Sequence, residues 1–222
     1  RNQGCNVIRL PALVYDFADK DQVFRDRDVV KLHQVRLVFA GTTDFKDYLE
    51  PILKAIRKMN DAEIKIIFDV VGPSPDAIES MLECSSPTQY GINCYGRLSH
   101  ENTLSIVRKA DFSVLMRENK RYAKAGVSTK FVEAMSLAVP SICTAVGGTD
   151  AFVSDGVDGF LIKDNSVYEI LDKLELIVNM DSSEILQMKL NALNKAKHVF
   201  SEDQYFEVTK LFLKGKEFNG QE

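Results

Sequence analysis

Basic side chains gather in residues 117–130 of a chain that is acidic overall. The whole sequence has 28 Lys and Arg against 32 Asp and Glu, yet this segment holds five cations and one acid, Glu118. The five cations are Arg117, Lys120, Arg121, Lys124 and Lys130. Cations of this kind bind phosphate and diphosphate groups. The segment therefore predicts a local anion site, whereas general binding of nucleic acid, which goes with a basic domain, is not expected.

The basic segment runs into a sequence with helical periodicity. STKFVEAMSLA (residues 128–138) carries apolar residues at helical spacing and is followed by Pro140. The first N–H groups of a helix lack partners and carry the positive end of its dipole, so anions bind there. Gly126 lets a ligand approach the backbone, and Ser128 and Thr129 add hydroxyl donors. The plain alternative is a solvated loop followed by a serine that only caps the helix; the pattern leaves both interpretations open.

Short apolar runs alternate with helix-length segments along most of the chain. Six runs are typical of buried parallel strands: residues 35–41, 64–72, 92–96, 111–116, 141–148 and 159–162. Helices are expected over residues 47–59, 75–85, 100–110 and 128–138, and two or three more finish the chain, over roughly 166–179, 183–200 and 201–214. This order predicts an α/β fold with one open, mostly parallel, doubly wound sheet. Ligands bind such sheets at the carboxyl ends of the strands, and the basic segment follows one such end.

The pattern indicates a single domain over residues 35–200. Residues 1–34 are expected to be a lead-in or interdomain linker, with one edge strand at most because Pro11 interrupts VIRLPALV (residues 7–14). Residues 201–222 are expected to form a closing helix and a tail. No apolar run approaches the roughly 20 residues that a bilayer-spanning helix needs. The sequence leaves attachment to a membrane surface open.

The cysteines and histidines do not suggest a metal site or a disulfide framework. The four cysteines lie far apart without a Cys-x-x-Cys pair: Cys5, Cys84, Cys94 and Cys143. Cys94 and Cys143 lie inside apolar runs, so we expect buried, reduced thiols, which suit a cytoplasmic protein. The histidines are scattered, and none is expected to bind a metal or act in catalysis: His33, His100 and His198.

One long segment resembles the C-terminal half of the family 4 glycosyltransferases, which have the GT-B fold. AGVSTKFVEAMSLAVPSICTAVGGTDAFVSDGVDGFLI (residues 125–162) matches the family's loop, helix with a central glutamate, Pro-led strand and Gly-Gly turn, and ends in a DG-x-x-G stretch. Residues 110–116 are similar to the strand before the donor loop, and residues 39–56 to the opening strand, glycine loop and helix. The likeness covers nearly all of residues 35–180. It implies a single Rossmann-like domain that binds the nucleotide half of an activated sugar donor.

The resemblance also implies roles for particular residues in binding a UDP- or GDP-sugar. Glu133 matches the glutamate that accepts hydrogen bonds from ribose hydroxyls, although its spacing would also suit an ion pair with Lys130 on an exposed helix face. Lys46 resembles the lysine that neutralises the diphosphate. The other expected contacts are the loop and helix start, Gly126, Val127, Ser128 and Thr129, and the cations Arg117, Lys124 and Lys130. No metal and no tightly bound cofactor are expected.

Two positions depart from the family pattern. Ala125 stands eight residues before Glu133, where the family usually has a glutamate that contacts the donor sugar. Thr42 follows the glycine of the first loop, where many members have an arginine. If the resemblance holds, other side chains must supply these contacts, and Glu118 and Arg117 are the candidates.

A GT-B enzyme has two Rossmann-like domains, and this chain supplies one. Residues 6–14 resemble the interdomain connection, and residues 201–213 resemble the closing helix that packs back towards the other half. Since the chain begins with Arg1, we expect an excised donor-binding domain that is inactive without its N-terminal acceptor domain. The resemblance implies a cytoplasmic enzyme, with membrane-peripheral contact through the missing half left open. Its acceptor would be a carbohydrate or a lipid-linked molecule in polysaccharide or glycoconjugate synthesis.

Two other functions remain open on the sequence. One is a non-catalytic nucleotide-binding or scaffolding module that associates with another chain. The other is an unrelated doubly wound enzyme acting on phosphate esters, which the sequence disfavours because it has no Walker A pattern, no Gly-x-Gly-x-x-Gly and no nucleophile elbow.

Overall fold

The computed structural model describes residues 7–8, 10–21, 23, 34–42, 48–121, 123 and 126–214. These residues contain a six-stranded sheet in the order β3-β2-β1-β4-β5-β6, with every pair of neighbours parallel. The strands are β1 (Val35–Ala40), β2 (Ile66–Val71), β3 (Ile92–Gly96), β4 (Phe112–Leu115), β5 (Ser141–Thr144) and β6 (Gly159–Ile162). The chain starts in the middle of the sheet, builds one half outwards, and returns to build the other. The predicted doubly wound fold is confirmed.

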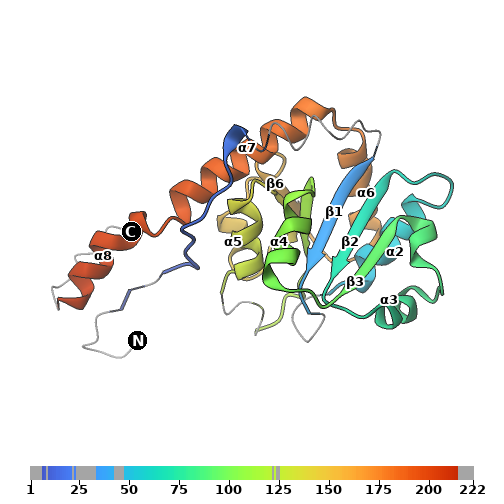
Figure 1. The fold of residues 1–222 in the computed structure, drawn as a ribbon, viewed down its shortest axis with the longest axis horizontal. Coiled ribbons are helices and arrows are strands. Elements are labelled where there is room, and N and C mark those ends of the chain that lie inside the picture. Colours follow the sequence, from blue (N-terminus) through green and yellow to red (C-terminus); the bar gives the residue numbers. More distant parts are fainter. Residues whose placement is uncertain are drawn as a thin grey trace.

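Helices cover both faces of the sheet (Figure 1). They are α2 (Glu50–Met59), α3 (Pro75–Leu82), α4 (His100–Arg108), α5 (Thr129–Ser136), α6 (Val167–Val178), α7 (Ser182–Val199) and α8 (Asp203–Leu213), with 3-10 turns η1 (Pro87–Tyr90) and η3 (Thr149–Ala151). Helices α2, α3 and α6 share one apolar core with the sheet. Helices α4, α5 and α7 pack on the opposite face through smaller apolar clusters.

The central strand β1 shows why the strands read as continuous apolar runs. Leu37 and Phe39 point into the core under α2, whereas Val38 points to the face covered by α4 and α5. Successive strand residues alternate between the two faces, and both faces here are buried. A strand of this kind therefore has almost no polar positions.

The start of α4 is fixed by a serine cap. Ser99 has an extended backbone, and its side-chain oxygen accepts a hydrogen bond from the backbone N–H of Asn102 at 3.3 Å. Capping of this kind satisfies one of the unpaired N–H groups of the first turn. His100 is therefore held as the first residue of the helix, four residues after β3 ends at Gly96.

The described residues of the lead-in form no strand of the sheet, which fits the expectation of one edge strand at most. Val14 makes only an isolated bridge with Ser201, and its N–H donates to the carbonyl of Phe200 at 2.8 Å. The chain then packs against α5 and α7 through Phe17 and Val23. The apolar residues of the lead-in thus contact helices instead of joining the sheet.

Candidate functional site

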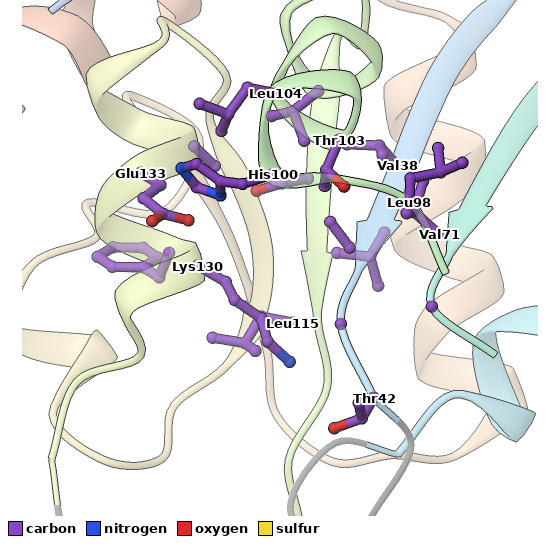
Figure 2. A pocket seen from close by; sticks show the side chains of 18 of the residues that line it. Val38, Thr42, Val71, Leu98, His100, Thr103, Leu104, Leu115, Lys130 and Glu133 are labelled. Carbon is purple, nitrogen blue, oxygen red and sulfur yellow. The ribbon is translucent and has the colours of Figure 1, made fainter. Parts of the chain in front are cut away.

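A cavity of about 400 Å³ lies at the carboxyl ends of β1 and β4. Its walls come from Gly41 and Thr42 after β1, Gly72 after β2, Leu98 before α4, and the facing sides of α4 and α5 (Figure 2). Strand β1 leads outwards to β2, whereas β4 starts the other half of the sheet. Doubly wound sheets bind ligands at such a switch point. The cavity is therefore where a ligand is expected from the topology alone.

Lys130, in the first turn of α5, crosses this cavity towards the end of β1. Its Nζ lies 5.6 Å from the ring centroid of Phe39. A Cβ placed on Gly41 would lie 2.0 Å from that Nζ and 2.5 Å from Cε. The ammonium group thus lies against the Gly41 backbone, and Figure 2 shows the side chain pointing towards Thr42. Glycine at position 41 gives the lysine this path.

Glu133 lies one turn further along the same side of α5. It is half-buried in the cavity wall, and its carboxylate makes no hydrogen bond or ion pair with any residue that the structure describes. The ion pair with Lys130 that the spacing would also suit is not formed. A carboxylate offers only acceptor positions. Glu133 is thus placed to accept hydrogen bonds from a ligand.

Two glycines meet where β1 and β2 end. Gly72 has φ +120°, and a Cβ there would lie 1.8 Å from the carbonyl oxygen of Gly41. Both the backbone angle and the contact exclude a side chain at this position.

Gly72→Ala should therefore lower the free energy of unfolding by at least about 2 kcal/mol, because the strained backbone and the overpacking contribute about 1–3 kcal/mol each. Gly96→Ala is the matched control, since Gly96 also has positive φ but an added Cβ there would have no atom of the described residues within 4 Å. Urea denaturation measures both variants. Equal losses in the two would contradict the close approach of Gly41 and Gly72.

The basic segment (residues 117–130) is hydrogen-bonded to β5 through the backbone of Arg117. The N–H of Arg117 donates to the Thr144 hydroxyl at 2.9 Å, and that hydroxyl donates to the Arg117 carbonyl at 3.0 Å. The Gly-Gly turn packs against the same segment, because a Cβ on Gly147 would lie 2.6 Å from the Ala123 carbonyl oxygen. The side chain of Arg117 is 9% exposed and is not part of the cavity wall.

The start of α5 lacks a side-chain cap. Ser128 occupies the cap position with an extended backbone, yet its side chain makes no capping hydrogen bond. No serine hydroxyl therefore competes with a ligand for the first N–H groups of α5. Gly126, Val127 and Ser128 do not line the cavity, and Thr129 lines a second one.

The structure thus brings two of the predicted site residues, Lys130 and Glu133, into one cavity. Lys46 and Lys124 lie outside the described residues, as does Ala125. Glu118 forms an ion pair with Lys120 and does not line the cavity, so it is not placed to replace the missing family glutamate.

The DG-x-x-G stretch stabilises a turn outside the cavity. Asp155 Oδ1 accepts from the N–H of Leu161 at 2.9 Å. Asp158 is buried, accepts from the N–H of Ser154 at 2.8 Å, and forms an ion pair with Lys195 of α7. This motif fixes β6 against α7 and takes no part in the site.

Sequence reasoning missed the β3–α4 side of the site. Arg97, Leu98 and His100 line the cavity opposite α5. A second cavity, of about 240 Å³, lies between the lead-in and the two helices, and His100 and Glu133 line both. These residues follow the carboxyl end of a predicted strand, and that position was the signal that could have identified them.

The cysteines described by the structure are unpaired, and the described residues contain no cluster suited to a metal ion. Cys143 is buried, which raises the pKa of its thiol to about 12, whereas Cys84 and Cys94 are half-buried. The expectation of buried thiols is thus met at Cys143 and only in part at Cys94, and Cys5 lies outside the described residues.

We expect Cys143 to resist iodoacetamide at pH 8 in the folded protein, because thiolate is the reactive form and pH 8 lies far below its pKa. It should react once the chain is denatured in urea. Peptide mass spectrometry measures both states. Alkylation of Cys143 in the folded protein would contradict its burial.

Comparison with known proteins agrees with this fold. Uncharacterized glycosyltransferase MJ1069 of Methanocaldococcus jannaschii is 29% identical over 139 residues, which is 62% of this chain and 34% of that protein. The crystal structure of Anabaena HepE in complex with UDP and glucose aligns with a TM-score of 0.66 at 14% identity, over 91% of this chain and 54% of that one. The C-terminal domain of LpcC, a glycosyl transferase group 1 family protein from Francisella tularensis, aligns with a TM-score of 0.59 at 20% identity, over 84% and 95%.

The chain spans about a third of MJ1069 and about half of HepE, and nearly all of the separately solved LpcC domain. Its sheet order and helix layers are those of one Rossmann-like half of a GT-B fold. The family described as "Glycosyl transferases group 1" matches residues 34–179. Because that match covers well over half of the sequence, this chain belongs to the group 1 glycosyltransferases.

Proposed function

We propose that this chain binds the nucleotide of a sugar donor in the cavity between α4 and α5. It would form the donor-binding half of an enzyme that transfers a sugar from a nucleoside-diphosphate sugar to an acceptor. One observation carries the proposal. A cation aimed at the end of β1 and a carboxylate without a described protein partner lie on the same side of α5, in one cavity at the sheet's switch point.

The chemistry of these two groups suits a nucleoside diphosphate. The ammonium of Lys130 lies at Gly41, near the positive end of α5, and matches the charge of the diphosphate. The carboxylate of Glu133 lies towards α4 and matches a vicinal pair of ribose hydroxyls. As the sugar leaves, charge builds on the diphosphate, and a fixed cation there stabilises the transition state. Arg117, Lys46, Lys124 and the backbone of residues 126–129 remain proposed contacts that the described geometry does not place in the cavity.

UDP- and GDP-sugars are the proposed donors. HepE, whose fold this chain shares, has been solved in complex with UDP-glucose as well as with UDP and glucose. That finding favours UDP as the first nucleotide to test. We propose no resident metal or cofactor.

We further propose that a second domain completes the enzyme. Helix α8 has no buried residue, and its Phe206 and Leu213 are 63% and 77% exposed. Figure 1 shows α8 and the lead-in extending from the same side of the sheet, and the lead-in also exposes Leu13 and Tyr15. These apolar side chains would pack against an acceptor domain that binds a carbohydrate or lipid-linked acceptor. Within the described residues, no helix is both long and apolar enough to cross a bilayer.

Isothermal titration of this chain with UDP, GDP and their sugars tests the proposal. We expect saturable binding with a Kd near 1 mM or tighter, equivalent to about −4 kcal/mol or more, and a preference for one base. We expect no sugar transfer by this chain alone. If neither nucleotide binds at millimolar concentration, to this chain or to the protein extended by a second α/β domain, the function as a scaffolding module is favoured instead.

A further inference from the structure

His100 lies across the cavity from Glu133. It is the first residue of α4, held there by the Ser99 cap, and it lines both the larger cavity and the smaller one behind it. Figure 2 shows its imidazole projecting from α4 towards the carboxylate of Glu133 on α5. The two side chains thus face each other from separate helices.

Neither side chain has a hydrogen bond or ion pair within the described part of the chain, including one with the other. Their immediate surroundings are largely apolar, with Leu98, Leu104 and Val107 in the same walls. Polar groups that point into a cavity with apolar walls usually fix the orientation of a ligand there. The two side chains together therefore suit a ligand group that can both donate and accept hydrogen bonds.

A neutral imidazole has one donor and one acceptor nitrogen, whereas a carboxylate only accepts. A vicinal diol matches this pair, because one hydroxyl can donate to Glu133 while its neighbour exchanges a hydrogen bond with His100. A single phosphate does not match, since Glu133 would repel it. The chemistry between α4 and α5 thus selects a ribose over a phosphate.

We propose that His100 is a second ribose-binding residue, so that the ribose of the donor nucleotide is held between the imidazole of α4 and the carboxylate of α5. This inference rests on the proposed function and extends it, because it assigns a role to His100 and requires a ribonucleotide in place of a deoxyribonucleotide. Lys130, on the other side of Glu133, contacts the diphosphate.

The test compares ribose and deoxyribose forms of the nucleotide. The chain is titrated with UDP and GDP, and the one that binds is compared with its 2′-deoxy and 3′-deoxy forms. His100→Ala should bind the ribonucleotide about 3- to 10-fold more weakly than the native protein, the effect of one neutral hydrogen bond. It should bind one of the two deoxy forms nearly as well as the native protein does. Inorganic pyrophosphate should bind both proteins equally.

His198→Ala is the matched control, because His198 is exposed on α7, where its Nδ1 is hydrogen-bonded to the carbonyl of Asn194. It should match the native protein with every ligand. If His100→Ala binds the ribonucleotide as tightly as the native protein, or loses the same factor with all three nucleotides, the ribose role is refuted while nucleotide binding stands. If the native chain binds no nucleotide, the proposed function fails first.

Discussion

Glu133→Ala will remove most of the affinity of this protein for a nucleoside diphosphate and leave its fold intact. Hydrogen bonds to a charged group contribute about 1.5–3 kcal/mol each, so we expect a loss of about 10- to 100-fold. The fold should survive because the carboxylate is half-buried and has no partner among the described residues. Calorimetry gives the affinity, and urea denaturation gives the free energy of unfolding.

Two further variants make this result specific. Glu133→Gln keeps the shape of the side chain and one acceptor oxygen but loses the charge, so its affinity should lie between those of the native protein and the alanine variant. Glu175→Ala removes an exposed carboxylate from α6, on the opposite face of the sheet, and should change nothing. Native affinity in Glu133→Ala would remove this residue from the site.

Lys130→Ala will weaken binding of the phosphate end of the ligand and leave binding of the nucleoside end nearly unchanged. A charge-assisted contact is lost with the ammonium group, so binding of UDP or GDP should weaken by about 10- to 100-fold. Binding of the corresponding nucleoside should hardly change, because Lys130 points to Gly41 and away from Glu133. Titrations with nucleoside, nucleoside diphosphate and pyrophosphate measure the difference.

Lys130→Met controls for the apolar stem of the lysine and should behave like the alanine variant. Lys173→Met is the matched control. Lys173 also places its Nζ over a phenylalanine, 5.4 Å from the ring centroid of Phe160, but outside the cavity. The Lys173→Met variant should bind the nucleoside, the nucleoside diphosphate and pyrophosphate as tightly as the native protein does. Equal losses of nucleoside and nucleoside diphosphate in Lys130→Ala would exclude a phosphate role.

Most of the fold could be predicted because it depends on local patterns. All six strands occur where apolar runs predicted them, and all seven helices occur with their ends shifted by a few residues. The shifts have local causes. Helix α3 ends at Leu82 and not at the expected residue 85, because Glu83 takes a left-handed backbone with φ 51°. Pro51 lies in the first turn of α2, where the missing N–H does no harm.

The lead-in was harder to predict because its partners are distant in sequence. VIRLPALV has the composition of a strand, yet the part that follows it packs on α5 and α7. No pattern within residues 7–14 contains that information. Apolar side chains are left exposed there and on α8, where the proposed second domain would cover them.

The candidate site was expected on α5, where the residues carry a resemblance, and its α4 side was missed because only the tertiary geometry reveals it. Glu133 and Lys130 were expected, but their i, i+3 spacing also suited an ion pair. The tertiary structure decides between an ion pair and separate places in the cavity. No ion pair forms between the two side chains, because Gly41 gives the lysine space at the end of β1. The sequence signals for His100 were only a helix cap and its position after a predicted strand, and its proposed role depends on facing Glu133 from another helix.

A crystal structure of this chain with UDP or GDP tests the central claim most directly. We predict the diphosphate beside Lys130 and Gly41 at the amino end of α5, with the ribose next to Glu133. A nucleotide bound outside this cavity, or bound within it with its phosphates away from Lys130, would contradict the account.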